Sequence, residues 1–75
     1  MMTPGDLTDR QREVAALVAD GVTNKRIAGQ LRISTRRVRI IISSVAFRIG
    51  ADPEKDERIA IAVWWVEHRI HRSAA

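Results

Sequence analysis

Hydrophobic residues recur along most of the chain at the spacing of an α-helix, and they divide it into four helical segments. In the first segment, from Thr8 to Gly21, Val14, Leu17 and Val18 fall on one face and charged residues occupy the other. Thr8 and a glutamine three positions later have the pattern of a capping box, and Gly21 is a typical helix end. The pattern predicts an amphipathic helix with one face in the core.

A tight turn separates the second and third predicted helices. The second begins at Thr23 and ends near Arg32, with inward-facing residues Ile27, Ala28 and Leu31. Ser34 is unfavourable inside a helix and favourable at an N-cap, so we expect two helices joined by a turn at residues 31–33. The third helix, from Ser34 to Ile49, has core-facing residues at helical spacing: Val38, Ile42, Val45 and Ile49.

The fourth predicted helix is apolar on two sides. We expect Asp52 to cap it and Pro53 to occupy its first position, and we expect it to end near His71. The face expected in the core contains Ile59, Val63, Val66 and Ile70. The opposite face, expected on the surface, contains Ile61, Trp64, Trp65 and His68.

These segments predict an all-α, four-helix fold in a single domain. The apolar runs 40–45 and 59–66 do not alternate and have no hairpin partner, which excludes a strand interpretation. The predicted domain spans residues 7–71, with flexible ends at 1–6 and 72–75. At 75 residues, the chain is too short for a two-domain enzyme with a deep cleft.

Composition and charge narrow the function. The chain has no cysteine, which excludes disulfides and thiolate metal sites, and 13 Lys and Arg against 9 Asp and Glu give a net charge of +4 that favours an anionic partner. The longest uncharged stretches have eight residues, whereas a membrane span needs about 20. No signal pattern opens the chain, so we expect a cytoplasmic, nucleoid-associated protein.

The second and third helices have the features of a DNA-reading helix-turn-helix. Ala28, Ile33 and Val38 are placed to fix how the two helices cross. On the opposite side of the third helix lie four residues that we expect to face bases: Arg36, Arg39, Ile40 and Ser43. For Ile40, the alternative is that it packs against a neighbouring loop.

Other polar residues suit the phosphate backbone of double-stranded DNA. They combine cationic side chains with small donors near the positive ends of two helices: Thr23, Asn24, Lys25, Ser34, Arg37 and Arg48. Each of them taken alone also fits an ordinary solvated surface position.

Two tryptophans on an exposed helix face would require a partner. We therefore expect a homodimer with an interface at Ile61, Trp64, Trp65 and His68, which would place two reading helices about one DNA turn apart. The alternative is that one tryptophan folds back onto the core, for instance over Leu7.

An enzyme is not indicated. Glu67, His68 and His71 could share a metal, but no further ligands are spaced to join them, and histidines near a helix end are favourable with the helix dipole. Glu54, Asp56 and Glu57 offset the dipole at the start of the fourth helix. We find no catalytic arrangement and expect no metal, cofactor or small-molecule ligand.

Several short motifs occur together in the order of one known family. Residues 7–14 match the phrase LTxREREV with Gln11 for Glu, residues 17–25 resemble LxAxGxSNK, and residues 31–34 resemble LxIS. Val38-Arg39 corresponds to the motif VK, and residues 48–50 correspond to the motif KLG. The chain therefore resembles the LuxR/GerE-type helix-turn-helix domain over about residues 7–70.

This resemblance implies a four-helix domain without winged elements that binds operator DNA as a transcription regulator, with the third helix in the major groove and the fourth used for dimerisation. It places Arg39, Ile40 and Ser43 at base-facing positions, and it places Asn24, Lys25, Arg37 and Arg48 near phosphates. The sequence departs from the family pattern at Arg26, Arg37, Ile41 and Ser44. It resembles free-standing members, an excised fragment of a longer regulator being the other interpretation.

A second hypothesis is an adaptor that binds another regulator or an RNA polymerase or sigma subunit. The apolar residues Ile40, Ile41 and Phe47 motivate it, together with the fourth helix. This hypothesis predicts weak DNA binding that does not depend on sequence.

Overall fold

The computed structural model describes residues 2–74 of the chain, and it describes the side chains of residues 2–68. A short 3₁₀-helix, η1 (Pro4–Asp6), precedes four α-helices: α1 (Asp9–Ala19), α2 (Asn24–Leu31), α3 (Thr35–Arg48) and α4 (Glu57–Ala74). No strand occurs among the described residues, which confirms the all-α prediction. None of the described helices combines the length and the apolar character that a membrane span requires.

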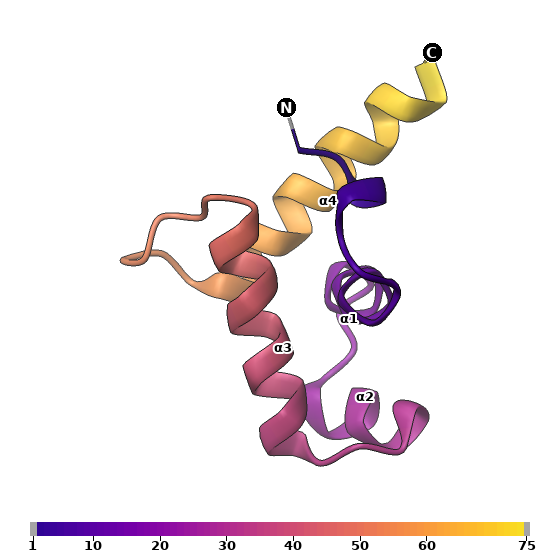
Figure 1. The fold of residues 1–75 in the computed structure, drawn as a ribbon, viewed down its shortest axis with the longest axis vertical. Coiled ribbons are helices and arrows are strands. Elements are labelled where there is room, and N and C mark those ends of the chain that lie inside the picture. The colour runs from indigo at the N-terminus through magenta and orange to yellow at the C-terminus, as the bar shows by residue number, and fades with distance from the viewer. Residues whose placement is uncertain (1, 75) are drawn as a thin grey trace.

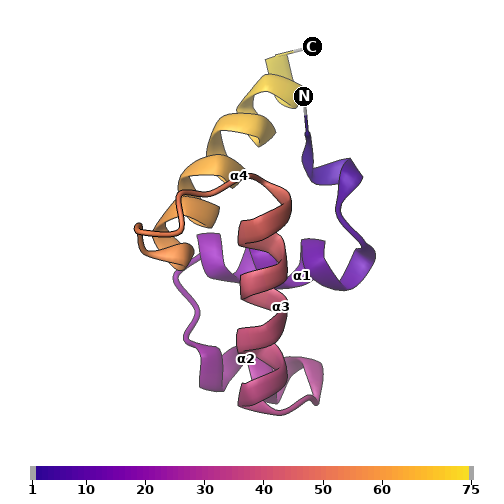
Figure 2. The ribbon, with the colours of Figure 1, turned by 60° about the vertical axis from the view of Figure 1, so that its left-hand side comes forward.

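The helices surround one core. The α3 helix runs through the middle of the view in Figure 1, with α2 beside its N-terminal end and α4 beside its C-terminal half. Figure 2 shows that α1 crosses behind α3, and α1 contacts both α3 and α4. Buried residues from all four helices meet there, among them Val14, Ile27, Val38 and Val45, each with 0% of its surface exposed.

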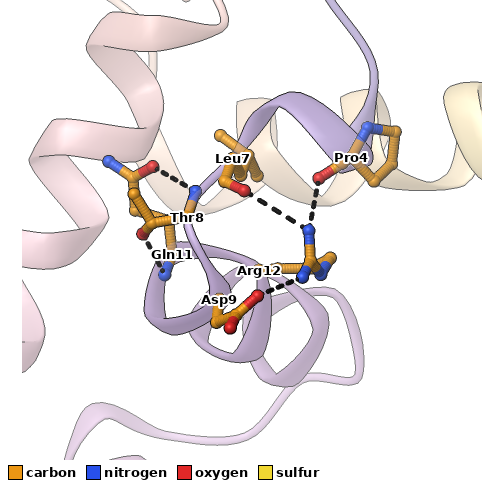
Figure 3. Close-up of polar contacts among 6 residues, drawn as sticks. All are labelled: Pro4, Leu7, Thr8, Asp9, Gln11 and Arg12. Carbon is orange, nitrogen blue, oxygen red and sulfur yellow. Dashed lines mark hydrogen bonds and ion pairs between the residues drawn. The ribbon is translucent and has the colours of Figure 1, made fainter.

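The first three helices begin where side-chain caps predict. The Thr8 Oγ1 accepts from the Gln11 N–H at 3.1 Å, and the Gln11 Oε1 accepts from the Thr8 N–H at 3.0 Å, which is the expected capping box (Figure 3). Thr23 caps α2 and Ser34 caps α3 in the same manner, through Oγ atoms that accept backbone N–H groups at 3.2 and 3.0 Å. The tight turn before Ser34 is therefore confirmed.

The N-terminal residues fold against α1 through Arg12, which we had expected only on the charged outer face. Its Nη1 donates to the carbonyl oxygens of Pro4 and Leu7, both at 3.3 Å, and its Nη2 pairs with the Asp9 carboxylate (Figure 3). In η1, the backbone N–H of Thr3 donates to Asp6 and holds the pKa of that carboxyl below its usual value. The 3₁₀-helix was not anticipated from the sequence.

The predicted start of α4 was wrong. Residues 53–55 form a turn, and the helix begins at Glu57, four residues later than expected. The cap is Asp56, because its Oδ1 accepts from the Ile59 N–H at 3.0 Å, whereas Asp52 accepts from the Glu54 N–H and stabilises the turn. At the other end, the backbone of α4 continues to Ala74 instead of ending at His71.

The predicted faces of α4 were also wrong, because the two are exchanged. Ile61 is fully buried, and Trp64 and Trp65 pack partly buried against the core cluster that includes Leu7. The alternative in which tryptophan folds onto the core therefore describes both indoles. The residues expected in the core lie on the surface: Ile59 is 65% exposed, Val63 52% and Val66 42%. The predicted core residue Ile70 lies outside the described side chains, as does His71.

Candidate DNA-binding surface

One side of α3 is exposed to solvent. It carries the four residues expected to face bases, Arg36, Arg39, Ile40 and Ser43, and we call this set the reading stripe. The other side of the helix holds Val38, Ile42 and Val45 in the core, so the orientation of α3 is fixed by packing. Ile40 keeps 52% of its surface exposed, which places it on the surface instead of beneath a loop.

The turn before α3 sets its angle to α2. Arg32 ends α2 in the left-handed conformation, with φ 57° and ψ 45°, and the next N–H, of Ile33, donates to the Ala28 carbonyl at 3.1 Å. Ala28 is 7% exposed and Val38 is fully buried, so the two helices approach each other closely at these small and branched side chains. The expected crossing residues are thus in place.

The starts of α2 and α3 supply donors for an anion. Thr23 and Ser34 use an oxygen lone pair for their own helix cap, which leaves each hydroxyl hydrogen free to donate outward. Both side chains are exposed, as are Lys25, two residues after Thr23, and Arg37, three residues after Ser34. Because helix N-termini carry partial positive charge, these sites suit phosphate groups.

Asn24 is oriented by Arg58, a residue that no sequence motif indicates. The Arg58 Nη1, from the first turn of α4, donates to the Asn24 Oδ1 at 2.6 Å, and the Arg58 Nη2 donates to the Val22 carbonyl at 2.5 Å. With its oxygen so engaged, the Asn24 amide presents its NH₂ group as the donor. No local signal marks Arg58, since its partners lie 34 and 36 residues away in the sequence.

The cations of this surface are not neutralised by carboxylates of the described residues. The two ion pairs found among residues 2–68, Arg10–Glu13 and Arg12–Asp9, both lie within α1. Arg26, Arg36, Arg37 and Arg39 are therefore available to an external anion. A carboxylate does reach the reading stripe: the Ser43 Oγ donates to the Glu57 Oε1 at 3.1 Å.

Arg48 is not brought together with the other predicted phosphate contacts. It lies at the C-terminal end of α3, and its Nη2 donates to the Asp6 carbonyl at 3.1 Å, next to η1. At 1.5 Å per residue, it stands about 13 Å along the helix from Arg39. Its role at a phosphate stays a prediction.

The apolar surface proposed for an adaptor is smaller than expected. Ile41 is 8% exposed and belongs to the core cluster, so it is not part of an exposed apolar surface. Phe47 is 87% exposed beside a groove of about 530 Å³ between the end of α3 and the loop before α4. Asp52 and Glu57 are the acidic residues that line this groove.

Comparison with known proteins identifies the family. The family of bacterial regulatory proteins described as the luxR family matches residues 6–56, which cover α1, α2, α3 and the turn before α4. Comparison with curated proteins and with solved structures finds no match. Since the matched segment spans well over half of the chain and contains the helix-turn-helix with its reading stripe, the chain belongs to the luxR family of bacterial regulatory proteins.

Proposed function

We propose that this protein is a transcription regulator that binds double-stranded DNA in a sequence-specific manner, with α3 in the major groove. The observation that carries the proposal is the reading stripe: two arginines, an isoleucine and a serine exposed on a helix whose other side is locked in the core. A protein with this function would act on the nucleoid.

The chemistry of the stripe suits base edges. Arg39 can bond the O6 and N7 of guanine with two donors, and Ile40 offers an apolar contact for a thymine methyl group. Thr23, Asn24, Lys25, Ser34 and Arg37 flank the stripe and would fix its register on the duplex through phosphates. Phosphate contacts alone would bind every sequence, so specificity has to come from the stripe.

The test is selection of genomic DNA fragments by the purified protein at about 150 mM salt, because electrostatic binding without sequence preference weakens there. The proposal expects one enriched motif with two related half-sites. Enrichment of no motif would contradict sequence-specific reading and would leave only general affinity for DNA.

Two variants separate the predicted base and phosphate contacts. Arg39→Ala should weaken binding to the selected operator by about 1–3 kcal/mol, with little effect on random DNA, because a bidentate base contact carries discrimination. Lys25→Ala should weaken both DNAs alike and lower the salt slope by about one unit. The measurement is a titration of each DNA at several salt concentrations.

Lys55→Ala is the matched control, since it removes the same charge from the turn before α4. It should leave the salt slope closer to that of the unchanged protein than Lys25→Ala does. Equal losses on operator and random DNA for Arg39→Ala would move Arg39 to the phosphate contacts.

Dimerisation through α4 belongs to the same proposal, but through the face that the structure exposes. Ile61 is enclosed in the core, and Trp64 and Trp65 pack on it, so they are poorly placed for a partner. His68 turns onto its own helix, with its Nδ1 2.8 Å from the Trp64 carbonyl and its ring stacked near the indole. The exposed stripe of Ile59, Val63 and Val66 supports a two-fold contact instead.

A second candidate function is the adaptor, and Phe47 is the observation that favours it. An aromatic ring exposed beside an apolar groove that acidic residues also line suits a basic amphipathic segment of another regulator or a polymerase subunit. A Phe47→Ser protein that keeps operator binding but no longer forms a complex with such a protein would support this function. Loss of operator binding by that variant would place Phe47 in the DNA surface.

A further inference from the structure

The hydroxyl group of Ser43 on the reading stripe has its hydrogen already committed. Its Oγ lies 3.1 Å from the Glu57 Oε1, and an ionised carboxylate has no hydrogen to give, so the serine is the donor. A serine hydroxyl has one hydrogen and two lone pairs. With the hydrogen directed to Glu57, only the lone pairs of Ser43 are left to face an incoming ligand.

Contacts among α4, α2 and α3 fix the position of Glu57. Glu57 is the first residue of α4, directly after the capping residue Asp56, and a carboxylate is stabilised at that end of a helix. The next residue, Arg58, ties the start of α4 to the start of α2 through its bonds to Asn24 and Val22. These bonds hold the Glu57 carboxylate against the middle of α3, at a cleft of about 290 Å³ that Arg39 and Ser43 also line.

The consequence follows from the groups that bases present in the major groove. Adenine N6 and cytosine N4 carry amino groups, which donate, whereas guanine O6 and N7 and thymine O4 accept. A free serine bonds to either kind, because its hydroxyl rotates. A serine held by a carboxylate can only accept, and the nearby negative charge additionally disfavours an oxygen atom of a base.

We propose that Glu57 is a specificity-determining residue, which makes Ser43 an acceptor and thereby selects a base with an amino group, adenine or cytosine, on the strand that Ser43 contacts. The inference rests on the proposed function, since it requires α3 to lie in the major groove. Glu57 itself need not touch DNA and acts as a positioning residue through the Ser43 hydroxyl.

The experiment begins with the operator selected by the unchanged protein. The Ser43→Ala protein identifies the base pair that Ser43 contacts, because preference at that position alone should flatten. Operator duplexes are then made with one exocyclic group missing at that pair: purine in place of adenine, or 2-pyrimidinone in place of cytosine. The loss of affinity on removing the amino group is then compared between the unchanged protein and Ser43→Ala. The difference reports the Ser43 contact alone, because the damage to the base pair is common to both proteins.

We expect removal of the amino group to cost the unchanged protein about 3- to 10-fold more than it costs Ser43→Ala, as one net hydrogen bond would give. In Glu57→Ala the Ser43 hydroxyl hydrogen is released, so the extra cost of removing the amino group should fall below about twofold. The base preference at this pair should shift toward guanine or thymine. Glu54→Ala is the matched control, because it removes an equal charge from the adjoining turn and does not contact Ser43.

The outcomes separate the two proposals. An operator with no coupling between Ser43 and an amino group, or a coupling that Glu57→Ala leaves unchanged, would overturn this inference and leave sequence-specific binding intact. An equal loss of coupling in Glu54→Ala would also overturn it, since the effect would be one of charge alone. Selection of no operator would overturn the proposed function, and this inference with it. Far-UV circular dichroism confirms that each variant is helical before it is tested.

Discussion

Arg32 has a positive φ, alone among the non-glycine residues that the structure describes. The left-handed conformation costs an L-residue about 1–2 kcal/mol, yet it is what ends α2 and turns the chain toward α3. The Arg32 side chain is exposed, so nothing in the core requires an arginine here. The backbone strain is therefore a consequence of the turn between the two helices, and glycine would remove it.

Arg32→Gly should make the domain more stable by about 0.5–1 kcal/mol, because glycine adopts positive φ without the steric cost and only part of the gain is offset by its freedom in the unfolded chain. The measurement is the urea midpoint at unchanged m-value. Arg32→Ala is the control, since it removes the same charge and keeps the strain. A glycine variant no more stable than the alanine variant would show that the turn relaxes without strain.

The helices that could be predicted closely are those with a local start signal. Thr8, Thr23 and Ser34 each accept a hydrogen bond from the residue three positions later, so three neighbouring residues decide where α1, α2 and α3 begin. Two aspartates precede α4, and each accepts a backbone N–H: Asp52 from the residue two positions later, in the turn, and Asp56 from the residue three positions later, as the helix cap. The proline after Asp52 favoured a helix start at Asp52. The observed start at Glu57 is fixed instead by the bonds of Arg58 to Asn24 and Val22, which lie far away in the sequence.

The faces of α4 could not be assigned from periodicity, since both stripes have helical spacing. Ile61, Trp64, Trp65 and His68 follow the same i, i+3, i+4, i+7 pattern that places Ile59, Val63 and Val66 together. In the structure, Ile61 belongs to the buried core cluster, and the two indoles pack partly buried against it. Large aromatic side chains bury the most apolar surface. The size of Trp64 and Trp65 is therefore the feature of the sequence that favours the observed face.

Truncation of α4 residues distinguishes the two faces. Ile61→Ala should destabilise the domain by about 2–5 kcal/mol, because it opens a cavity at a site with 0% exposure. Ile59→Ala, in the same helix and with 65% of its surface exposed, should change stability by less than about 0.5 kcal/mol. Urea unfolding of both variants measures the difference. A larger loss for Ile59→Ala than for Ile61→Ala would mean that α4 packs through the face expected from the sequence.

The reading stripe was predictable because it depends on one helix and its spacing of about 100° per residue. Arg36, Arg39, Ile40 and Ser43 are exposed together for the same reason that Val38 and Ile42 are buried. The contacts that modify the stripe were not predictable. Glu57 meets Ser43 across 14 residues, and Arg58 meets Asn24 across 34, so they exist only once α4 is docked on the other helices. These contacts, which we propose to tune recognition, are thus a tertiary property of the domain.

In the proposed function, those contacts would make α4 a common element of DNA recognition and dimerisation. Its first turn holds Glu57 and Arg58 against the helix-turn-helix, while the exposed stripe of Ile59, Val63 and Val66 continues along the same helix. A two-fold contact through this stripe would fix the start of α4 in both subunits and, through it, the separation of the two reading helices. Binding to paired half-sites should therefore depend on residues that contact no DNA.

Replacing Ile59 and Val63 together by serine should weaken the dimer and lower affinity for a two-half-site operator by at least about tenfold, while binding to a single half-site stays unchanged, because only the linkage between subunits is lost. Sedimentation equilibrium and titration of the two DNAs measure the effects. The matched control is Arg10→Ser with Glu13→Ser, which replaces two exposed residues of α1 at no net change in charge. A serine variant of α4 that sediments as the unchanged protein does, and that retains its preference for paired half-sites, would exclude this stripe as the interface and direct attention to the groove beside Phe47.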